Sequence, residues 1–221
     1  MKQEIIVTSD GSKTIYLPEL DETYHSSHGA VQEAKHVFIQ NGLDAFADKD
    51  IAVFEMGFGT GLNALLSFIQ AENNTTSIHY TGIEAYPVAT DIALQMDYCQ
   101  LVGEEHSAKF EQLHTVNWDE KIQLSDQFSF KKVHQKIEDY TPELDSFDIV
   151  FYDAFGPRAQ ETMWVPTILQ KMYDMLKLGG FLVTYCAKGQ VKRDLKALGF
   201  EIEALPGPPG KREMTRAWKK S

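Results

Sequence analysis

The sequence predicts an α/β fold in which a mostly parallel β-sheet carries helices on both faces. Short apolar segments alternate along the chain with longer amphipathic segments, which is typical of parallel sheets with crossover helices. A glycine-rich turn, residues 57–61, lies between an apolar run and a helix-like stretch. The chain has 221 residues, of which 43% are hydrophobic, and this is enough for one large core.

The first 45 residues are predicted to form a hairpin and a helix that pack as an extension on the main sheet. Residues 4–17 contain two apolar runs around an Asp-Gly dipeptide, which is typical of short hairpin turns. Residues 29–43 have apolar side chains at helical spacing. Residues 46–221 then form one compact core domain, because no linker or internal repeat interrupts them.

The core domain continues the alternation of strands and helices. The predicted strands are residues 51–57, 77–85, 128–135, 147–155, 181–187, 200–205 and 213–220. The predicted helices are residues 61–72, 87–101, 161–177 and 190–198. Pro87 is expected near the first turn of the second of these helices, where its missing N–H costs nothing.

Composition and charge argue against several classes of protein. Apolar segments near the glycine turn are shorter than the roughly 18–20 residues of a membrane span, and the first residues lack a secretory signal, so a cytoplasmic protein without membrane contact is expected. Two cysteines and seven scattered histidines show no metal-ligand spacing, so neither a disulfide nor a metal site is expected. The net charge is −11, although residues 187–221 carry nine Lys/Arg against four Asp/Glu. On charge alone, these cations are interpreted as a solvated helix face and an edge strand.

The glycine-rich turn is the first candidate site. Gly57, Gly59 and Gly61 lie where a flexible turn lets the backbone approach a ligand closely. Glu84 ends the next predicted strand, and a carboxylate at such a strand end accepts hydrogen bonds from ribose hydroxyls. The spacing G-x-G-x-G differs from the dinucleotide pattern G-x-G-x-x-G, and the turn lacks the lysine of a phosphate-binding loop. Tight packing of strand against helix is the alternative explanation for these glycines.

The second candidate site is "FYDAFGPRAQETMW", residues 151–164. Asp153 follows a strand predicted to lie beside the first one, so its carboxylate should emerge at the same edge of the sheet. Tyr152, Phe155 and Trp164 are expected to surround it with aromatic surface, which suits a cation or a stacked base. The alternative is that these rings belong to the core, Trp164 first among them, and that Asp153 caps a helix.

Four stretches of the chain resemble the methyltransferase domain of the MnmC family, bacterial enzymes that modify the wobble uridine of tRNA. They are "DETYHSSHGAVQEAKHVFIQNGL", "FEMGFGTGLN", "FYDAFGPRAQETMW" and "GPPGKREMTRAWK", in the family's order. The resemblance implies a Rossmann-like class I fold with S-adenosyl-L-methionine (SAM) as cofactor. It further implies that the substrate is a tRNA anticodon arm bearing 5-aminomethyl-(2-thio)uridine, and that the product is the 5-methylaminomethyl form. Because the resemblance covers the methyl-transfer half and no flavin-dependent oxidase domain, a separate enzyme is expected to supply the aminomethyl precursor.

The resemblance also implies roles for individual residues. The residues implied for cofactor binding are Glu55, Gly57, Phe58, Gly59, Gly61, Glu84, Asp153 and Gln135, which stands where the family often has an acid beside the adenine. The residues implied for substrate binding are Tyr24, His25, Phe155, Lys211 and Arg212, the last two as phosphate contacts unless Glu213 pairs with them. Asp153 matches the family's acid and is the candidate catalytic residue that holds the reacting amine. Because an aspartate of ordinary pKa is a poor base, orientation is favoured over proton acceptance.

Two other functions stay open at the level of sequence. One is transfer of a methyl or aminopropyl group to a small amine, which suits the acidic body of the chain better than a polyanion such as tRNA does. The other is a SAM- or RNA-binding module without catalysis, against which the glycine turn and Asp153 both argue.

Overall fold

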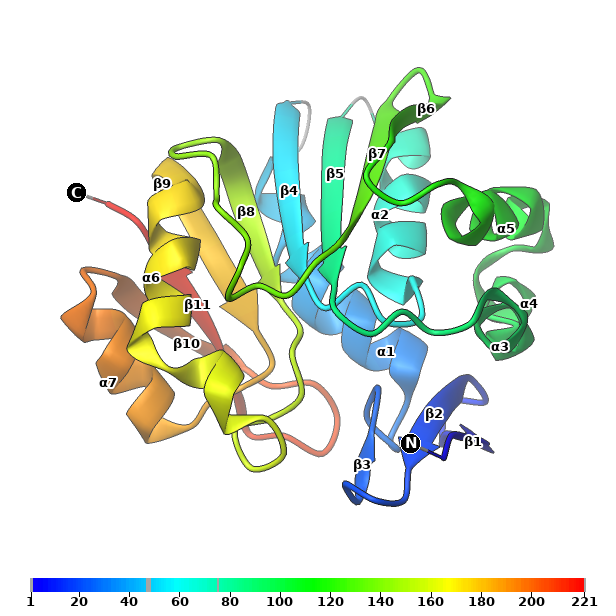
Figure 1. Ribbon diagram of the computed structural model, residues 1–221, viewed down its shortest axis with the longest axis horizontal. Helices are drawn as coiled ribbons and strands as arrows, with labels where there is room; N and C mark the ends of the chain where they lie inside the picture. Colours follow the sequence, from blue (N-terminus) through cyan, green and yellow to red (C-terminus); the bar gives the residue numbers. More distant parts are fainter. Residues whose placement is uncertain (1, 47–48, 75, 221) are drawn as a thin grey trace.

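The computed structural model describes residues 2–46, 49–74 and 76–220. Its centre is an eight-stranded sheet with the order β10-β11-β9-β8-β4-β5-β7-β6 (Figure 1). The strands are β4 (Asp50–Met56), β5 (Ser77–Glu84), β6 (Lys121–Ser125), β7 (Phe128–His134), β8 (Phe147–Tyr152), β9 (Leu176–Thr184), β10 (Glu201–Pro206) and β11 (Glu213–Trp218). The α-helices are α1 (Ala30–Ala34), α2 (Leu62–Asn73), α3 (Thr90–Ala93), α4 (Cys99–Val102), α5 (Ser107–Thr115), α6 (Pro166–Met175) and α7 (Gly189–Ala197). Short π and 3-10 helices are η1 (Lys35–Gln40), η2 (Leu43–Phe46), η3 (Leu94–Met96), η4 (Glu104–His106) and η5 (Glu161–Trp164).

The five central strands of this sheet are parallel, and the strands toward both edges are antiparallel. The parallel set is β9, β8, β4, β5 and β7, whereas β6, β11 and β10 pair in the opposite direction. From β4 the chain continues to β5 on one side and later returns to β8 on the other. In open α/β sheets, ligands bind outside the carboxyl ends of the strands at such a reversal. The predicted fold class is confirmed, and the reversal indicates where a ligand site should lie.

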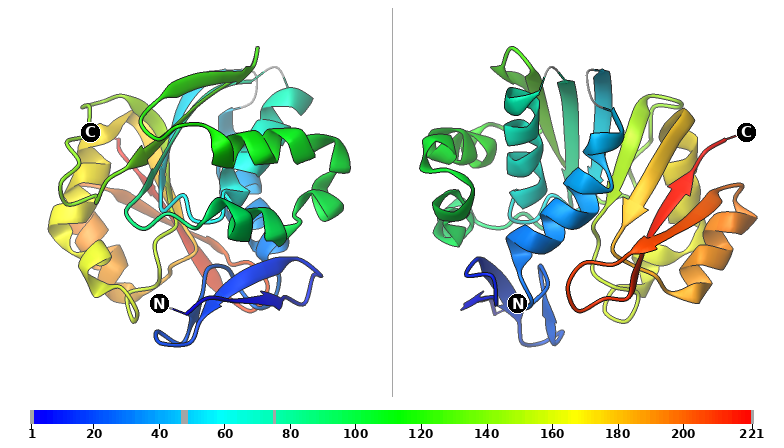
Figure 2. Two further views of the ribbon diagram at one scale, coloured as in Figure 1. Left: turned by 45° about the vertical axis from the view of Figure 1, so that its right-hand side comes forward. Right: turned by 180° about the vertical axis from the view of Figure 1, so that it is seen from behind.

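Helices cover both faces of the sheet. Helices α1 and α2 lie over one face of the sheet, which is turned toward the viewer in the right-hand view of Figure 2. Helices α6 and α7 lie over the other face. Because side chains alternate along a strand, neighbours on β8 enter different cores. Phe151 packs against Phe38 in the buried cluster on one face, and Tyr152 belongs to the buried cluster on the other face, together with Leu169.

The N-terminal extension forms a small sheet of its own. Strands β1 (Glu4–Val7) and β2 (Lys13–Leu17) make the predicted hairpin, and β3 (Glu22–Thr23) pairs with the other side of β2. Ile15 and Leu17 are buried in the same core as the main sheet. The extension thus shares a buried cluster with the main sheet, while the division of the chain at residue 45 stays a prediction.

Two predicted helices are interrupted in the structure. The helix expected over residues 87–101 begins at Thr90 and consists of α3, η3 and α4, because Asp97 has a left-handed backbone (φ 52°) that stops the helix. The helix expected over residues 161–177 is split at Val165, which precedes Pro166 and is therefore held extended. That prediction was also wrong at its end, since β9 already starts at Leu176.

The sequence analysis missed helix α5 and strand β6. Helix α5 buries Phe110, Leu113 and His114, and this is a narrow stripe for a helix. Strand β6 is an edge strand of alternating exposure that carries one fully buried side chain, Leu124. Both elements are held mainly by tertiary contacts, so their hydrophobic periodicity is weak.

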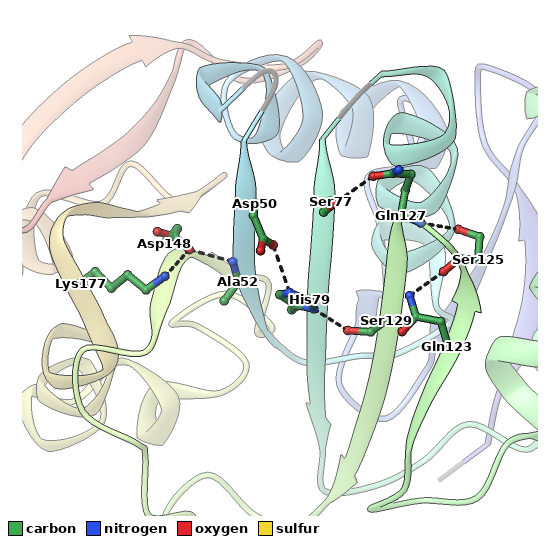
Figure 3. A network of polar contacts seen from close by, with 10 residues as sticks. All are labelled: Asp50, Ala52, Ser77, His79, Gln123, Ser125, Gln127, Ser129, Asp148 and Lys177. Carbon is green, nitrogen blue, oxygen red and sulfur yellow. Dashed lines mark hydrogen bonds and ion pairs between the residues drawn. The ribbon is translucent and has the colours of Figure 1, made fainter.

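The amino edge of the sheet carries a network of paired polar groups (Figure 3). Asp148 on β8 accepts hydrogen bonds from the backbone N–H of Ala52 (2.7 Å) and from Lys177 (2.8 Å). On the neighbouring strand pair, His79 lies 3.0 Å from Asp50. These side chains link β9, β8, β4 and β5, so the polar groups of this edge are used within the sheet.

Candidate active site

A cavity of about 780 Å³ opens at the carboxyl edge of the sheet, around the ends of β4, β5, β7 and β8. This size is typical of sites that enclose a cofactor or small ligand. The predicted site residues that line it are Tyr24, His25, Gly57, Phe58, Gly59, Glu84, Gln135, Asp153 and Phe155. Glu55, Gly61, Lys211 and Arg212 lie outside this lining.

The glycine turn is anchored between the ends of two neighbouring strands. The backbone N–H groups of Gly57 and Phe58 both donate to the Ile83 carbonyl of β5, at 3.1 and 3.0 Å. On the other side, the N–H of Asp153 donates to the Met56 carbonyl at 3.1 Å. Gly57 has φ 90°, and a Cβ at this position would lie 3.1 Å from the Asp153 carbonyl oxygen. A larger residue would therefore crowd the strand end and fill the space beside the turn.

Glu84 is joined directly to the glycine turn. Its Oε2 accepts a hydrogen bond from the backbone N–H of Gly59 at 3.0 Å, and its Oε1 accepts one from Tyr86 at 2.9 Å. A carboxylate has about four acceptor positions, so further positions remain for donors from a ligand in the cavity. The predicted pairing of turn and acid is present, and it is suited to hydroxyl groups of a ribose.

Asn63 joins two carboxyl groups at the wall of the cavity. Its Nδ2 donates to Glu55 Oε1 at 2.9 Å and to Asp153 Oδ2 at 2.8 Å. Asn63 lines the cavity, whereas Glu55 is 1% exposed and lies outside the lining. Direct contact between Glu55 and the cofactor, as predicted, therefore does not fit its position. Glu55 instead holds Asn63, which in turn holds Asp153.

Burial changes the acidity of both carboxyl groups. It raises the pKa of Glu55 well above the usual range, helped by the negative charge of Asp153. Burial also raises the pKa of Asp153 to about 7, while the hydrogen bond from Asn63 opposes this rise. Burial thus favours the neutral form of both carboxyl groups, and a pKa of about 7 lets Asp153 change its protonation state near neutral pH. The Oδ1 of Asn63 is buried with no hydrogen-bond partner among the described residues, so it is an unpaired acceptor beside the cavity.

The aromatic surroundings of Asp153 differ from the prediction. Phe155 lines the cavity, and the ring of Tyr24 meets it edge to face with centroids 5.1 Å apart. Tyr152 and Trp164 instead pack against each other in the core beneath α6, with centroids 4.9 Å apart. Their predicted place around Asp153 is wrong, because strand alternation turns Tyr152 to the opposite face of the sheet.

Two residues of the N-terminal extension close the cavity and stay neutral. Burial raises the pKa of Tyr24 to about 12, with a further contribution from Glu84. Burial lowers the pKa of His25 to about 4, and its Nδ1 lies 3.3 Å from the Thr14 hydroxyl. Neither side chain therefore adds charge to the site at pH 7, and both present polarizable ring surface to a ligand.

Lys211 and Arg212 lie beside a second cavity, on the other side of the loop that follows Asp153. Lys211 is held by Glu33 at 2.7 Å, and its Nζ lies 3.9 Å from the centre of the Tyr185 ring. Glu213, the alternative partner in the sequence analysis, is 3.9 Å from Arg212. Of the two predicted phosphate contacts, Arg212 is thus the more available.

Asn63 is the main site residue that sequence reasoning missed. The available signal was a polar residue in the first turn of a helix, among the apolar residues of the stretch "GLNALL". Asn63 is 2% exposed, and a buried amide needs partners. The two carboxyl groups that supply them come from different strands, so the fold was needed to find them.

A family model described as "S-adenosyl-L-methionine-dependent methyltransferase" matches residues 95–220, more than half of the chain. The chain belongs to this methyltransferase family. It is therefore an enzyme that uses SAM, and the cavity with its glycine turn and Glu84 is the candidate cofactor site of this methyltransferase.

Comparisons with individual proteins agree with the family. Two proteins described as tRNA 5-methylaminomethyl-2-thiouridine biosynthesis bifunctional protein MnmC are similar to it. The one from Cupriavidus metallidurans is 30% identical over 228 residues, which cover 97% of this chain and 33% of the relative. The one from Cupriavidus necator is 31% identical over 230 residues, with 97% and 34% covered. The methyltransferase thus spans about a third of the length of these curated relatives.

A solved structure described as MNMC2 from Aquifex aeolicus superposes on the methyltransferase with a TM-score of 0.78. Its identity is 24%, and the match covers 100% of this chain and 71% of that chain, so it shows the fold. The curated relatives confirm the resemblance to the MnmC methyltransferase domain. In the described ranges, no helix is long and apolar enough to cross a membrane, and His, Cys, Asp and Glu form no group of three or more that could hold a metal ion.

Proposed function

We propose that the methyltransferase transfers a methyl group to the primary amine of 5-aminomethyl-(2-thio)uridine at the wobble position of tRNA, which yields the 5-methylaminomethyl form. The observation that carries this proposal is the carboxyl group of Asp153, which faces the cofactor cavity and is held there by Asn63. The names of the MnmC relatives supply the substrate class.

The residues present fit SAM. A side chain at Gly57 or Gly59 would crowd the Asp153 carbonyl or the Tyr24 ring at the cavity wall, and Glu84 offers acceptors for the ribose hydroxyls. Gln135 lines the cavity beyond the end of β7 and offers its amide to the adenine. The unpartnered Oδ1 of Asn63 suits a positively charged amino group. When bound, SAM supplies an electrophilic methyl group on a sulfonium centre.

Asp153 orients the substrate amine and accepts its proton. An alkyl amine has a pKa of roughly 10, so at pH 7 it is mostly protonated and cannot attack. The sequence analysis gave Asp153 an ordinary pKa and ranked it a poor base. Burial instead raises its pKa to about 7, close to the working pH of a general base. Proton acceptance at an Oδ of Asp153 thus joins orientation as its role.

Phe155 and Tyr24 provide the surface for the base. Both are partly buried side chains, and Phe155 lies in the loop that begins with Asp153. Stacking of a base on an aromatic ring contributes about 1–3 kcal/mol and tolerates a modified uracil. An aminomethyl group on a uracil stacked there would reach toward Asp153. A separate enzyme that generates the primary amine is the partner that this reaction requires.

The test is transfer of labelled methyl groups from SAM into tRNA that lacks the final wobble methyl group, followed by nucleoside analysis. Label in 5-methylaminomethyluridine is expected from the wild type. Asp153→Asn should lower kcat by about a hundredfold or more, since it removes both the charge and the proton acceptor. Asp139→Asn is the matched control, because it makes the same change at an exposed carboxylate outside the cavity. The proposal would be contradicted if the enzyme transferred label to a small amine and not to tRNA.

A further inference from the structure

A second cavity of about 640 Å³ lies on the carboxyl side of the sheet, between the loops that follow β8, β9 and β10. Its charged lining consists of four cations, Arg158, Lys188, Lys211 and Arg212, and two acids, Glu22 and Glu213. The chain as a whole carries −11, so a local excess of positive charge here is unusual for this molecule. An acidic protein repels a polyanion over most of its surface, and such a region is where one can be held.

Two of the four cations are already paired. Arg158 lies 2.8 Å from Glu22, and Lys211 lies 2.7 Å from Glu33. These pairs join the N-terminal extension to the loops after β8 and β10, so they hold the walls of the cavity together. Paired cations contribute less to binding a further anion, because part of their charge is neutralised on the protein.

The other two cations are available. The side chain of Arg212 is 94% exposed, and Glu213, at 3.9 Å from Arg212, lies closer to Lys192 at 2.9 Å. Lys188 is exposed at the start of α7, and no carboxylate of the described residues lies within ion-pair distance of it. Lys188 and Arg212 are therefore the groups able to bind an anion in the cavity.

The loop that carries Arg212 is pre-organised. The N–H of Gly207 donates to the Arg212 carbonyl at 3.2 Å, and the N–H of Lys211 donates to the Pro208 carbonyl at 2.9 Å. A Cβ on Gly210 would lie 2.3 Å from the ring of His28, so this turn packs closely on the N-terminal extension. A rigid loop loses little conformational entropy when Arg212 contacts a ligand.

The second cavity shares a wall with the active site. The loop after β8 lines the active-site cavity with Asp153 and Phe155 and the second cavity with Gly156 and Pro157. Behind this loop, the Tyr185 hydroxyl donates to the Ala154 carbonyl at 2.9 Å. Figure 1 shows the loops after β8 and β10 at the same lower edge of the molecule. A chain whose base enters the first cavity would pass over Phe155 and meet the second.

We propose that the second cavity binds a backbone phosphate of the RNA substrate beside the target nucleotide, with Lys188 and Arg212 as its ligands. This inference rests on the proposed function, since it assumes an RNA substrate. It assigns a site to the polyanion that the acidic body of the chain would otherwise repel, and that site lies apart from the chemistry at Asp153.

The experiment compares the double variant Lys188→Ala/Arg212→Ala with the charge-matched control Lys121→Ala/Lys220→Ala. Lys121, at the start of β6, and Lys220, beyond β11, are both exposed and line neither cavity. The dissociation constant for unmodified tRNA is measured by fluorescence anisotropy at several salt concentrations, and KM and kcat are measured with the tRNA substrate. The rise in melting temperature caused by SAM shows that each variant is folded.

Loss of Lys188 and Arg212 should raise the dissociation constant and KM about tenfold or more, and change kcat less than twofold. The slope of log K against log salt should fall by about 0.7–0.9 for each cation lost. The control should match the wild type in both respects. Equal constants and slopes for the two double variants would overturn the inference.

The two proposals can fail separately. If the wild type methylates tRNA and the Lys188/Arg212 variant behaves like the control, the proposed function stands and the phosphate site is wrong. If the wild type binds tRNA without methylating it, the proposed function is wrong. The salt-dependence measurement then still decides whether the second cavity binds RNA.

Discussion

Replacing Asn63 by alanine should change the pH at which the enzyme works. The substitution removes the donor that holds Asp153 at 2.8 Å and Glu55 at 2.9 Å. A hydrogen bond to a charged group contributes about 1.5–3 kcal/mol, and about 1.4 kcal/mol corresponds to one pKa unit. Because the bond from Asn63 lowers the pKa of Asp153, its loss should raise that pKa further.

The sign of the effect follows from the role of Asp153. Asp153 accepts a proton only when ionised, so kcat falls as the pH drops through its pKa, which is about 7 in the wild type. In Asn63→Ala this fall should move to higher pH by about one to two pH units. The assay is kcat for tRNA methylation from pH 5.5 to 9.5 at saturating SAM.

Leu66→Ala is the matched control for lost stability. It removes a buried side chain from the same helix, α2, without touching either carboxyl group, and should cost about 2–5 kcal/mol. In Leu66→Ala, kcat should fall at the same low pH as in the wild type. If kcat of Asn63→Ala falls at the same pH as in the wild type, or at a lower pH, then Asn63 does not set the protonation of Asp153 and the reasoning is refuted.

Three further predictions concern the cofactor, the glycine turn and a buried lysine. Glu84→Gln should raise the dissociation constant for SAM about tenfold in calorimetry, since it weakens bonds to a charged acceptor, and a change below twofold would contradict this role. Gly61→Ala should lower the melting temperature by about 2–8 °C, because φ is 75° and the new Cβ would lie 2.8 Å from His114; an unchanged melting temperature would show that the turn relaxes freely. Burial lowers the pKa of Lys132 from 10.5 to about 8, so the unfolded chain binds more protons and the free energy of unfolding should rise between pH 8 and 10. Lys132→Met should remove that rise in denaturant titrations, and a rise that persists would assign it to other groups.

Several features of the site could be predicted from the sequence because they depend on local chain geometry. Gly57 and Gly59 were recognised by their place between a strand and a helix, and Glu84 by its place at the next strand end. Each of these positions follows from the alternation of strands and helices, because the carboxyl ends of parallel strands lie at the same edge of the sheet. The structure joins Gly59 to Glu84 at 3.0 Å, as that geometry requires.

Other features depend on contacts between distant segments and could not be predicted. Tyr152 and Phe155 look alike in sequence, yet strand alternation places Tyr152 in the core and leaves Phe155 in the cavity. Lys211 was expected to bind phosphate, but it forms an ion pair with Glu33, which lies 178 residues earlier in the chain. Helix α5 and strand β6 form with weak periodicity, because their neighbours supply most of the contacts.

By itself, the sequence determined the α/β fold class and the places of the glycine turn, Glu84 and Asp153 at the ends of predicted strands. These depend on residue type and spacing, which local sterics and hydrophobic periodicity translate directly into structure. The tertiary structure alone decided the acidity of Asp153, the supporting role of Glu55 and the second, basic cavity. Burial, hydrogen-bond partners and local charge arise only when strands and loops far apart in the chain are brought together, and these three quantities control pKa and anion binding.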